Sequence, residues 1–371
     1  MLTKKILLLS AYDAVSHQHW RRGLVANFPE YDWTVLTLPA RHFSWRIRGN
    51  SLSWAYSERD VLEQPFDLII ATSMTDLSAL KGMVPSLAST PSLLYFHENQ
   101  FDYPASGNEY QSIEPKITSI YAALSATRIA FNSGYNRQTF LTGVKSLLKK
   151  MPDHVPGNIV EILEQRSFCL PVPLDDSWSD LQHQPTEPFT ILWNHRWEYD
   201  KAPERLFSAL LKLKERKIDF RIHVVGQRFR KTPSVFEEMH PSLSDQIGTW
   251  GYVEDMEEYR NLTRQSHVVV STALHDFQGL AILEATAAGC IPCVPDRLAY
   301  REFIPDMFRH DSSPEDEVRE SEALATALLQ LAESHKRGQL PSPLDLSYLF
   351  WSSMRKQYRK EIEALTNLSG K

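Results

Sequence analysis

Short apolar runs recur along this 371-residue chain, and segments long enough to form helices separate them. In the first half these runs lie at residues 6–9, 33–38, 66–71, 92–96 and 128–131. A strand covered by helices on both faces reads as a continuous apolar run, whereas a half-exposed strand alternates. The sequence therefore predicts the α/β class, with parallel sheets wound on both faces.

The second half repeats this pattern after a break rich in proline. Pro171 and Pro173 restrict their own backbone and that of the residues before them, which predicts an extended crossover. Further strands are expected at residues 189–193, 220–226, 250–254 and 267–271. A chain of this length with 42% apolar residues can bury two cores. We therefore expect domains at residues 1–172 and 173–345, followed by a C-terminal helix within residues 346–371.

The composition argues against several classes of protein. No apolar run approaches the roughly 20 residues that span a bilayer, so no membrane partner is expected. A formal net charge of −6 gives no overall attraction for nucleic acid, which would need a local basic patch. Cys290 and Cys293 flank an expected buried strand, where thiols act as core residues rather than metal ligands. A reducing cytoplasm fits this cysteine usage best.

A motif in the second half combines a polar turn with an apolar helix. The turn ends at Gly279, Gly289 closes the helix, and a β-prone segment follows. Free backbone N–H groups at Gly279 and Leu280, together with the helix dipole, would bind a phosphate. Asp276 precedes the helix and Glu284 lies within it, where a buried carboxylate is costly without a partner or ligand. The alternative is a capping aspartate and a solvent-facing glutamate.

Two cations follow the first expected strand of the second domain. Arg196 and Lys201 lie just after residues 189–193, where a loop should reach the edge of the sheet. A guanidinium binds two phosphate oxygens and an ammonium adds a compact charge, so the pair suits a nucleotide diphosphate neutralised without metal. Alternatively, both are solvated surface charges.

In the first half, polar side chains follow three expected strands, at the edge where open α/β sheets bind ligands. They are His97, Glu98 and Asn99 after residues 92–96, Asn132 and Ser133 after residues 128–131, and Ser16 and His17 after the first strand. Ser16 and Ser133 can cap the helices that follow, and His17 would point toward the strand ends. Without a ligand, capping alone explains Ser133 and a surface position explains His17.

The motif from Asp276 to Glu284, followed by a tail at residues 289–294 that contains Pro292, resembles the acid-x7-Glu signature of family-4 retaining glycosyltransferases. That family has the GT-B fold. The resemblance implies two Rossmann-like doubly wound domains facing across a cleft, with a C-terminal helix crossing back to the first domain. Asp276 departs from the family, which usually has Glu at this position, and the glycines that usually follow the first strand are absent.

The same resemblance implies a role for each residue of the donor site. The second acid binds the ribose, and the first acid orients the hexose together with a histidine of the first domain. An Arg and a Lys bind the diphosphate, and a later loop holds the nucleobase. In this order the residues are Glu284, Asp276, His97, Arg196, Lys201, Tyr252 and Val253, with Gly279 and Leu280 at the helix end. No protein nucleophile is implied.

Three stretches are similar, more narrowly, to the tRNA-queuosine α-mannosyltransferase family: residues 16–17, 97–100 and 193–201. This resemblance implies transfer of mannose from GDP-mannose to queuosine at the wobble position of the aspartate tRNA, with no metal or other cofactor. Three alternatives stay open. They are a small-glycan or lipid-linked sugar acceptor, a sugar-nucleotide epimerase, and a non-catalytic protein that binds nucleotide sugars.

A tRNA partner would need a local cationic rim on this acidic chain. Mixed arginines and aromatics suit splayed single-stranded bases such as those of an anticodon loop. The candidates are Arg21 and Arg22 on the first helix, Arg41, Arg46 and Arg48 in the next loop with Trp45 and Trp54 interleaved, and Lys145, Lys149 and Lys150. As solvated charges they would need no partner.

Overall fold

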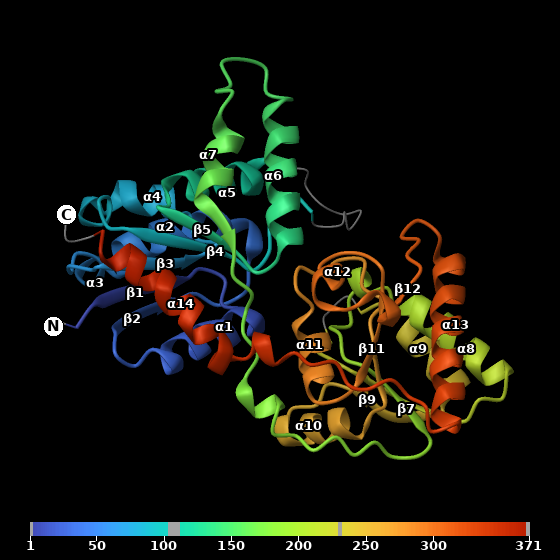
Figure 1. The fold of residues 1–371 in the computed structure, drawn as a ribbon. Helices are drawn as coiled ribbons and strands as arrows, with labels where there is room; N and C mark the ends of the chain where they lie inside the picture. The colour runs from blue at the N-terminus through green and yellow to red at the C-terminus, as the bar shows by residue number, and fades with distance from the viewer. Residues whose placement is uncertain (1–2, 103–111, 229–231, 369–371) are drawn as a thin grey trace. The chain divides into compact units, whose positions relative to one another are not determined.

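The computed structural model describes residues 3–102, 112–228 and 232–368, which form two compact units (Figure 1). Unit 1 comprises Met1–Pro173 together with Trp351–Lys371, and unit 2 comprises Leu174–Phe350. The chain therefore leaves unit 1 once and returns to it at its end.

Unit 1 is built on a six-stranded parallel sheet with the order β2-β1-β3-β4-β5-β6. Its strands are β1 (Lys5–Ser10), β2 (Asp32–Thr37), β3 (Leu68–Thr72), β4 (Ser92–Phe96), β5 (Arg128–Phe131) and β6 (Ser167–Cys169). Its first seven helices are α1 (Val15–Asn27), α2 (Phe43–Ser57), α3 (Arg59–Leu62), α4 (Leu77–Met83), α5 (Glu114–Ser125), α6 (Gly134–Leu148) and α7 (Ile159–Arg166). Strand order reverses between β1 and β3, so the carboxyl ends of these strands flank a switch point of the kind that binds ligands.

The last helix, α14 (Trp351–Thr366), belongs to the core of unit 1, where it packs on α1 (Figure 1). Gly23 makes room for it, because a Cβ there would lie 2.5 Å from the Trp351 indole. The buried Tyr358 hydroxyl accepts from the Trp20 indole at 3.0 Å and donates to the Pro171 carbonyl at 2.9 Å. These bonds join the end of the chain to α1 and to the segment that leaves unit 1.

Unit 2 contains a second six-stranded parallel sheet, with the order β12-β11-β10-β7-β8-β9. Its strands are β7 (Phe189–Trp193), β8 (Phe220–Val225), β9 (Ile247–Gly251), β10 (Val268–Val270), β11 (Ile291–Pro295) and β12 (Arg309–His310). Its helices are α8 (Pro203–Glu215), α9 (Val235–Met239), α10 (Met256–Gln265), α11 (Leu280–Ala287), α12 (Tyr300–Phe303) and α13 (Glu317–Lys336). The order reverses between β7 and β10, which puts the loops after these strands at the ligand-binding edge.

The predicted α/β class with parallel sheets is confirmed in both units. The expected strands at residues 92–96, 128–131 and 189–193 have the same bounds in the structure. The expected core position of Cys290 and Cys293 is confirmed as well, because both thiols are buried and burial raises their pKa values. Among the described helices, none is long and apolar enough to cross a membrane.

Three local expectations in unit 1 are wrong. Ser16 does not cap α1, because the helix already begins at Val15 and Ala14 occupies the N-cap position. Residues 43–57 form helix α2 rather than a loop. As a consequence Arg46 and Trp54 are buried and cannot belong to an exposed cationic rim.

Replacing Tyr358 with phenylalanine should destabilise unit 1, because the Trp20 N–H and the Pro171 carbonyl lose a buried partner. We expect the free energy of unfolding to fall by ~1–3 kcal/mol in urea denaturation. Tyr121→Phe, at an exposed tyrosine of α5, is the matched control and should change it by less than about 0.5 kcal/mol. Unchanged stability of Tyr358→Phe would show that these bonds contribute nothing net.

Candidate functional site

Lys201 occupies the centre of a polar network at the carboxyl edge of the unit 2 sheet. Its ammonium donates to the His275 carbonyl at 2.6 Å. It also lies 3.3 Å from a carboxylate oxygen of Asp200 and 3.8 Å from one of Asp276. Only 6% of the residue is exposed, and a buried ammonium is stable only with such partners. Lys201 therefore ties the loop after β7 to the loop after β10.

The alternative of a solvated surface charge is wrong for Lys201, which is buried, and stays open for Arg196. The side chain of Arg196 is 44% exposed and pairs with Glu198 at 2.7 Å, as a surface cation would. Lys201 is enclosed instead, and one of its partners, the Asp276 carboxylate, comes from 75 positions further along the chain. Local spacing could not show this, since the partner comes from another strand end.

A chain of hydrogen bonds with a single direction leads to Asp276. The Tyr300 hydroxyl donates to Asp276 at 3.1 Å, because a carboxylate only accepts. Ser271 lies 2.7 Å from the Tyr300 oxygen and must therefore donate to it. His195 Nε2, 3.0 Å from the Ser271 oxygen, must then donate to Ser271. This fits a neutral ring, since burial and the charge of Lys201 lower the pKa of His195 to about 3.

Asp276 is ionised in this network. Burial alone would raise its pKa, but the charge of Lys201 and the hydrogen bond from Tyr300 bring the pKa below its ordinary value. A fixed anion beside a buried cation makes the site electrostatically preorganised.

Gly279 gives the start of α11 its shape. Its φ of 78° favours glycine, and a Cβ there would lie 2.7 Å from the Tyr300 ring. The N–H of Gly279 donates to Asp276 at 3.0 Å, so the expectation that this N–H is free for a phosphate is wrong. The amides of Leu280, Ala281 and Ile282, in the first turn of α11, lack intrahelical acceptors.

Glu284 lies one turn into α11 and is half-buried, between the packed and solvent-facing positions considered above. Burial and then the charge of Glu284 raise the pKa of Tyr259, which places the two side chains near each other. Asn194 joins this group by donating to the Tyr259 hydroxyl at 2.8 Å and to the Ala281 carbonyl at 2.9 Å. Sequence reasoning missed Asn194 and Tyr259, although an asparagine directly after a buried strand was a usable signal.

The residues expected to hold the nucleobase follow β9, at the end of the sheet. Tyr252 is 61% exposed and Val253 is half-buried. Beside them, the Arg228 guanidinium lies 4.3 Å over the Trp197 ring, and its Nη2 would lie 3.0 Å from a Cβ on Gly251. This side of the site therefore offers an exposed aromatic ring and a second cation, and nucleobase binding there stays a prediction.

His97 and His17 stack at the carboxyl edge of the unit 1 sheet, with ring centroids 4.3 Å apart. Both are buried, which excludes the surface position considered for His17. His17 Nε2 donates to Glu98 at 3.3 Å, and burial with the neighbouring His17 and His19 holds the pKa of His97 well below its ordinary value. Among the described residues, His97 Nε2 and His17 Nδ1 have no hydrogen-bond partner. Enclosed polar atoms of this kind need a water or ligand to complete their bonds.

The remaining candidate residues of unit 1 make hydrogen bonds within the loops after β4 and β5, next to this pair of histidines. Asn132 donates to the His97 carbonyl at 2.9 Å and accepts from Asn136 at 2.8 Å. The Ser133 hydroxyl caps α6 by accepting from the Asn136 N–H at 3.0 Å, as predicted. Asn99 is buried and donates to the Asn136 side chain at 2.9 Å. These bonds give Asn99, Asn132 and Ser133 scaffolding roles, whereas His97 and His17 have the unfilled polar atoms.

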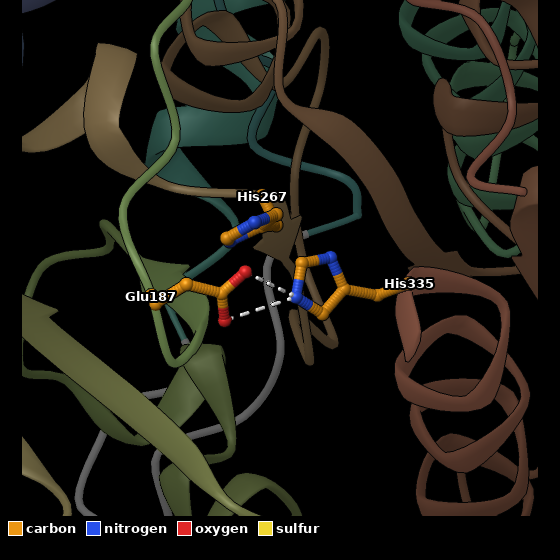
Figure 2. A group of neighbouring side chains, drawn as sticks. All are labelled: Glu187, His267 and His335. Atoms are coloured by element: carbon orange, nitrogen blue, oxygen red, sulfur yellow. Dashed lines mark hydrogen bonds and ion pairs between the residues drawn. The ribbon is translucent and has the colours of Figure 1, made fainter. Parts of the chain in front are cut away.

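Glu187, His267 and His335 bring metal-ligand atom types within 4.8 Å of one another elsewhere in unit 2 (Figure 2). His335 pairs with Glu187 at 3.2 Å. The Thr190 N–H donates to His267 Nδ1 at 3.0 Å, and burial lowers the pKa of that ring to about 4. The neutral ring therefore carries its hydrogen on Nε2, whereas a metal-bound histidine donates from its second nitrogen. The trio is therefore a hydrogen-bonded pair, His335 and Glu187, beside a neutral ring, with no nitrogen of His267 available to a metal.

Solved structures with a similar fold include glycosyltransferases and synthases. The sucrose-phosphate synthase (tll1590) from Thermosynechococcus elongatus has a TM-score of 0.71 at 13% identity, over 98% of this chain and 99% of that one. The pneumococcal O-GlcNAc transferase GtfA, solved with UDP and GlcNAc, has a TM-score of 0.61 at 15% identity. That match covers 83% of this chain and 59% of the GtfA chain. Two parallel α/β units with these neighbours define the GT-B fold.

Residues 176–338 match the model of the glycosyl transferases group 1 family, so the chain is a glycosyltransferase. Residues 5–174 match the model described as tRNA-queuosine alpha-mannosyltransferase N-terminal. The tRNA-queuosine alpha-mannosyltransferase of Drosophila melanogaster is 30% identical over 310 residues, which cover 81% of each chain. This chain belongs to the tRNA-queuosine alpha-mannosyltransferase family.

Lys201→Met should destabilise unit 2 because it leaves the enclosed carboxylates of Asp200 and Asp276 without their cation. We expect a loss of ~3–5 kcal/mol in chemical denaturation. Arg196→Ala should cost at most about 1 kcal/mol, because the Arg196 side chain is 44% exposed.

Lys212→Met, which removes a surface lysine of the same unit, is the matched control and should leave stability within about 0.5 kcal/mol of the parent. If Lys201→Met unfolds at the same denaturant concentration as Lys212→Met, Lys201 is not the structural centre of this network.

Proposed function

We propose that this protein transfers mannose from GDP-mannose to queuosine in the anticodon loop of tRNA, with the aspartate tRNA as acceptor. The observation that carries the proposal is the similarity to the Drosophila enzyme, which extends over 81% of both chains and so includes both units. The match of residues 5–174 to the queuosine-specific family model supports an acceptor site in unit 1. A tRNA acceptor also fits the cytoplasmic location expected from the few cysteines.

The donor binds to unit 2 in this proposal. Arg196 and the first amides of α11 contact the diphosphate. Lys201 stabilises the charge of the diphosphate from its buried position, without direct contact. Glu284 binds the ribose hydroxyls, and the aromatic ring of Tyr252 with Val253 lies against the guanine. The enclosed Asp276 orients the hexose, and its network keeps the carboxylate ionised and fixed.

The reaction retains the anomeric configuration and follows the family-4 pattern. The bond between the anomeric carbon and the diphosphate oxygen breaks, and a bond from that carbon to a queuosine hydroxyl oxygen forms on the same face. The hydroxyl proton moves to the departing phosphate oxygen, so no protein nucleophile takes part. Arg196, Lys201 and the α11 amides stabilise the negative charge that develops on this oxygen.

Unit 1 presents the acceptor to this reaction. The unfilled nitrogen of His97 can bond a hydroxyl of the hexose, and Glu98 with His17 can bond the cyclopentenediol of queuosine. Ser16 is exposed at the first turn of α1, one residue before His17. Asn99, Asn132 and Ser133 act indirectly, by holding the loops after β4 and β5.

Mass spectrometry of nucleosides tests the acceptor and the donor together. Purified protein is incubated with GDP-mannose and queuosine-containing tRNA, and in parallel with matched queuosine-free tRNA. We expect a hexose-shifted queuosine in the first sample and no shifted nucleoside in the second. Consumption of GDP-mannose without a modified nucleoside, or modification only with UDP-sugars, would contradict the acceptor or the donor assignment respectively.

The transfer should survive removal of divalent cations. Arg196, Lys201 and the α11 amides supply the positive charge that a metal would otherwise bring to the diphosphate. We expect the initial rate of tRNA mannosylation in EDTA to stay within about twofold of the rate without chelator. Complete loss of activity that Mg²⁺ or Mn²⁺ restores would show that a metal, and not these residues, neutralises the diphosphate.

A further inference from the structure

Helix α2 exposes a stripe of large apolar side chains in unit 1. Trp45, Leu52 and Tyr56 are 55%, 45% and 75% exposed, and Arg48 lies in the same stripe. Their spacing of three, four and four residues places all of them on one face of the helix. Exposed apolar residues that gather on one element mark a surface that binds something, in contrast to single ones. We name these four residues the α2 stripe.

The indole of Trp45 lies flat on its own helix. A Cβ on Gly49, one turn further along, would lie 2.4 Å from the indole ring, so only glycine at position 49 leaves room for the ring there. One face of the ring packs against the helix backbone at Gly49, and the rest of the ring is exposed. A fixed aromatic face of this kind is a platform on which another planar group can stack at little cost in side-chain entropy.

The α2 segment itself carries basic and no acidic residues. No acidic residue occurs between Asp32 and Glu58, and two of the three arginines in this segment, Arg41 and Arg48, are exposed. Arg48 is held beside the platform by Asp76 at 2.9 Å and Glu114 at 3.4 Å, and its side chain is still 48% exposed. Arg41, at the approach to the helix, is exposed.

The stripe begins at the ligand-binding edge of the unit 1 sheet. The Phe43 ring lies 6.2 Å from the ring of Tyr12, which follows β1. Asn50 donates to the carbonyl of Met74, which follows β3, at 3.1 Å. The N-terminal half of α2 is therefore anchored to the loops after β1 and β3, at the same edge as His97.

We propose that the α2 stripe is the surface on which unpaired bases of the acceptor RNA stack, next to the base that receives the sugar. This proposal rests on the proposed function. Stacking on aromatic rings with arginines beside them is the way proteins hold single-stranded RNA regardless of its sequence.

Steady-state kinetics with the full chain test the proposal. Trp45→Ala should raise the KM for queuosine-containing tRNA about 5- to 150-fold, the range expected for one lost base stack. Trp45→Phe keeps a ring and should stay closer to the parent. Binding of GDP, measured by calorimetry, should be unchanged in both variants because the donor binds to unit 2.

Tyr121→Ala is the matched control, since Tyr121 of α5 in unit 1 is exposed by 55%, the same fraction as Trp45. It should leave the KM for tRNA unchanged, and circular dichroism verifies that each variant is folded. If the parent mannosylates tRNA and Trp45→Ala has the same KM as Tyr121→Ala, the stripe does not bind RNA and this inference is wrong. A parent that modifies no tRNA would contradict the proposed function instead.

Discussion

A buried ammonium holds together the two loops from which unit 2 builds its site. Lys201 comes from the loop after β7, and its partners Asp276 and the His275 carbonyl come from the loop after β10. The same Asp276 accepts from Tyr300 and from the Gly279 N–H, so it also fixes the start of α11. Lys201 therefore holds the two loops in place. Any charge that it contributes to a bound diphosphate acts from its buried position beneath these loops.

Strands were predictable from the sequence because buried parallel strands are continuous apolar runs. The runs at 92–96, 128–131 and 189–193 needed no knowledge of partners. The short strands β6 and β12 were missed, because two or three residues show no periodicity. The helix at residues 43–57 was missed as well, because a segment rich in arginine and tryptophan resembles a polar loop. Local composition identifies elements, but their length and burial are set by the sheet on which they pack.

The positions of the site residues were predictable from the sequence, but their burial and their hydrogen-bond partners were not. Residues such as Arg196 and His97 were expected at strand ends and lie there, because the carboxyl edge of a parallel sheet collects whatever follows its strands. Burial of Lys201 and the use of the Gly279 N–H by Asp276 depend on contacts across the fold. For the same reason the scaffolding bonds of Asn99 and Asn132 could not be separated in advance from ligand contacts.

The two units contribute different kinds of polar group. Unit 2 offers a fixed pattern of charges, in which Lys201 and Asp276 already have each other as partners. Unit 1 offers hydrogen-bonding groups, above all the stacked pair of His17 and His97, whose unfilled nitrogens are enclosed. Charge suits a diphosphate, and hydrogen-bonding nitrogens suit sugar hydroxyls. This division of chemistry is the physical basis for assigning the donor to unit 2 and the acceptor to unit 1.

Amide hydrogen exchange after addition of GDP tests this assignment most directly, because it locates the nucleotide without requiring turnover. The account predicts slower exchange in the peptides that contain Arg196, Lys201 and the first turn of α11, with unit 1 peptides around His97 unchanged. Protection confined to unit 1, or none in the two unit 2 segments at saturating GDP, would contradict it.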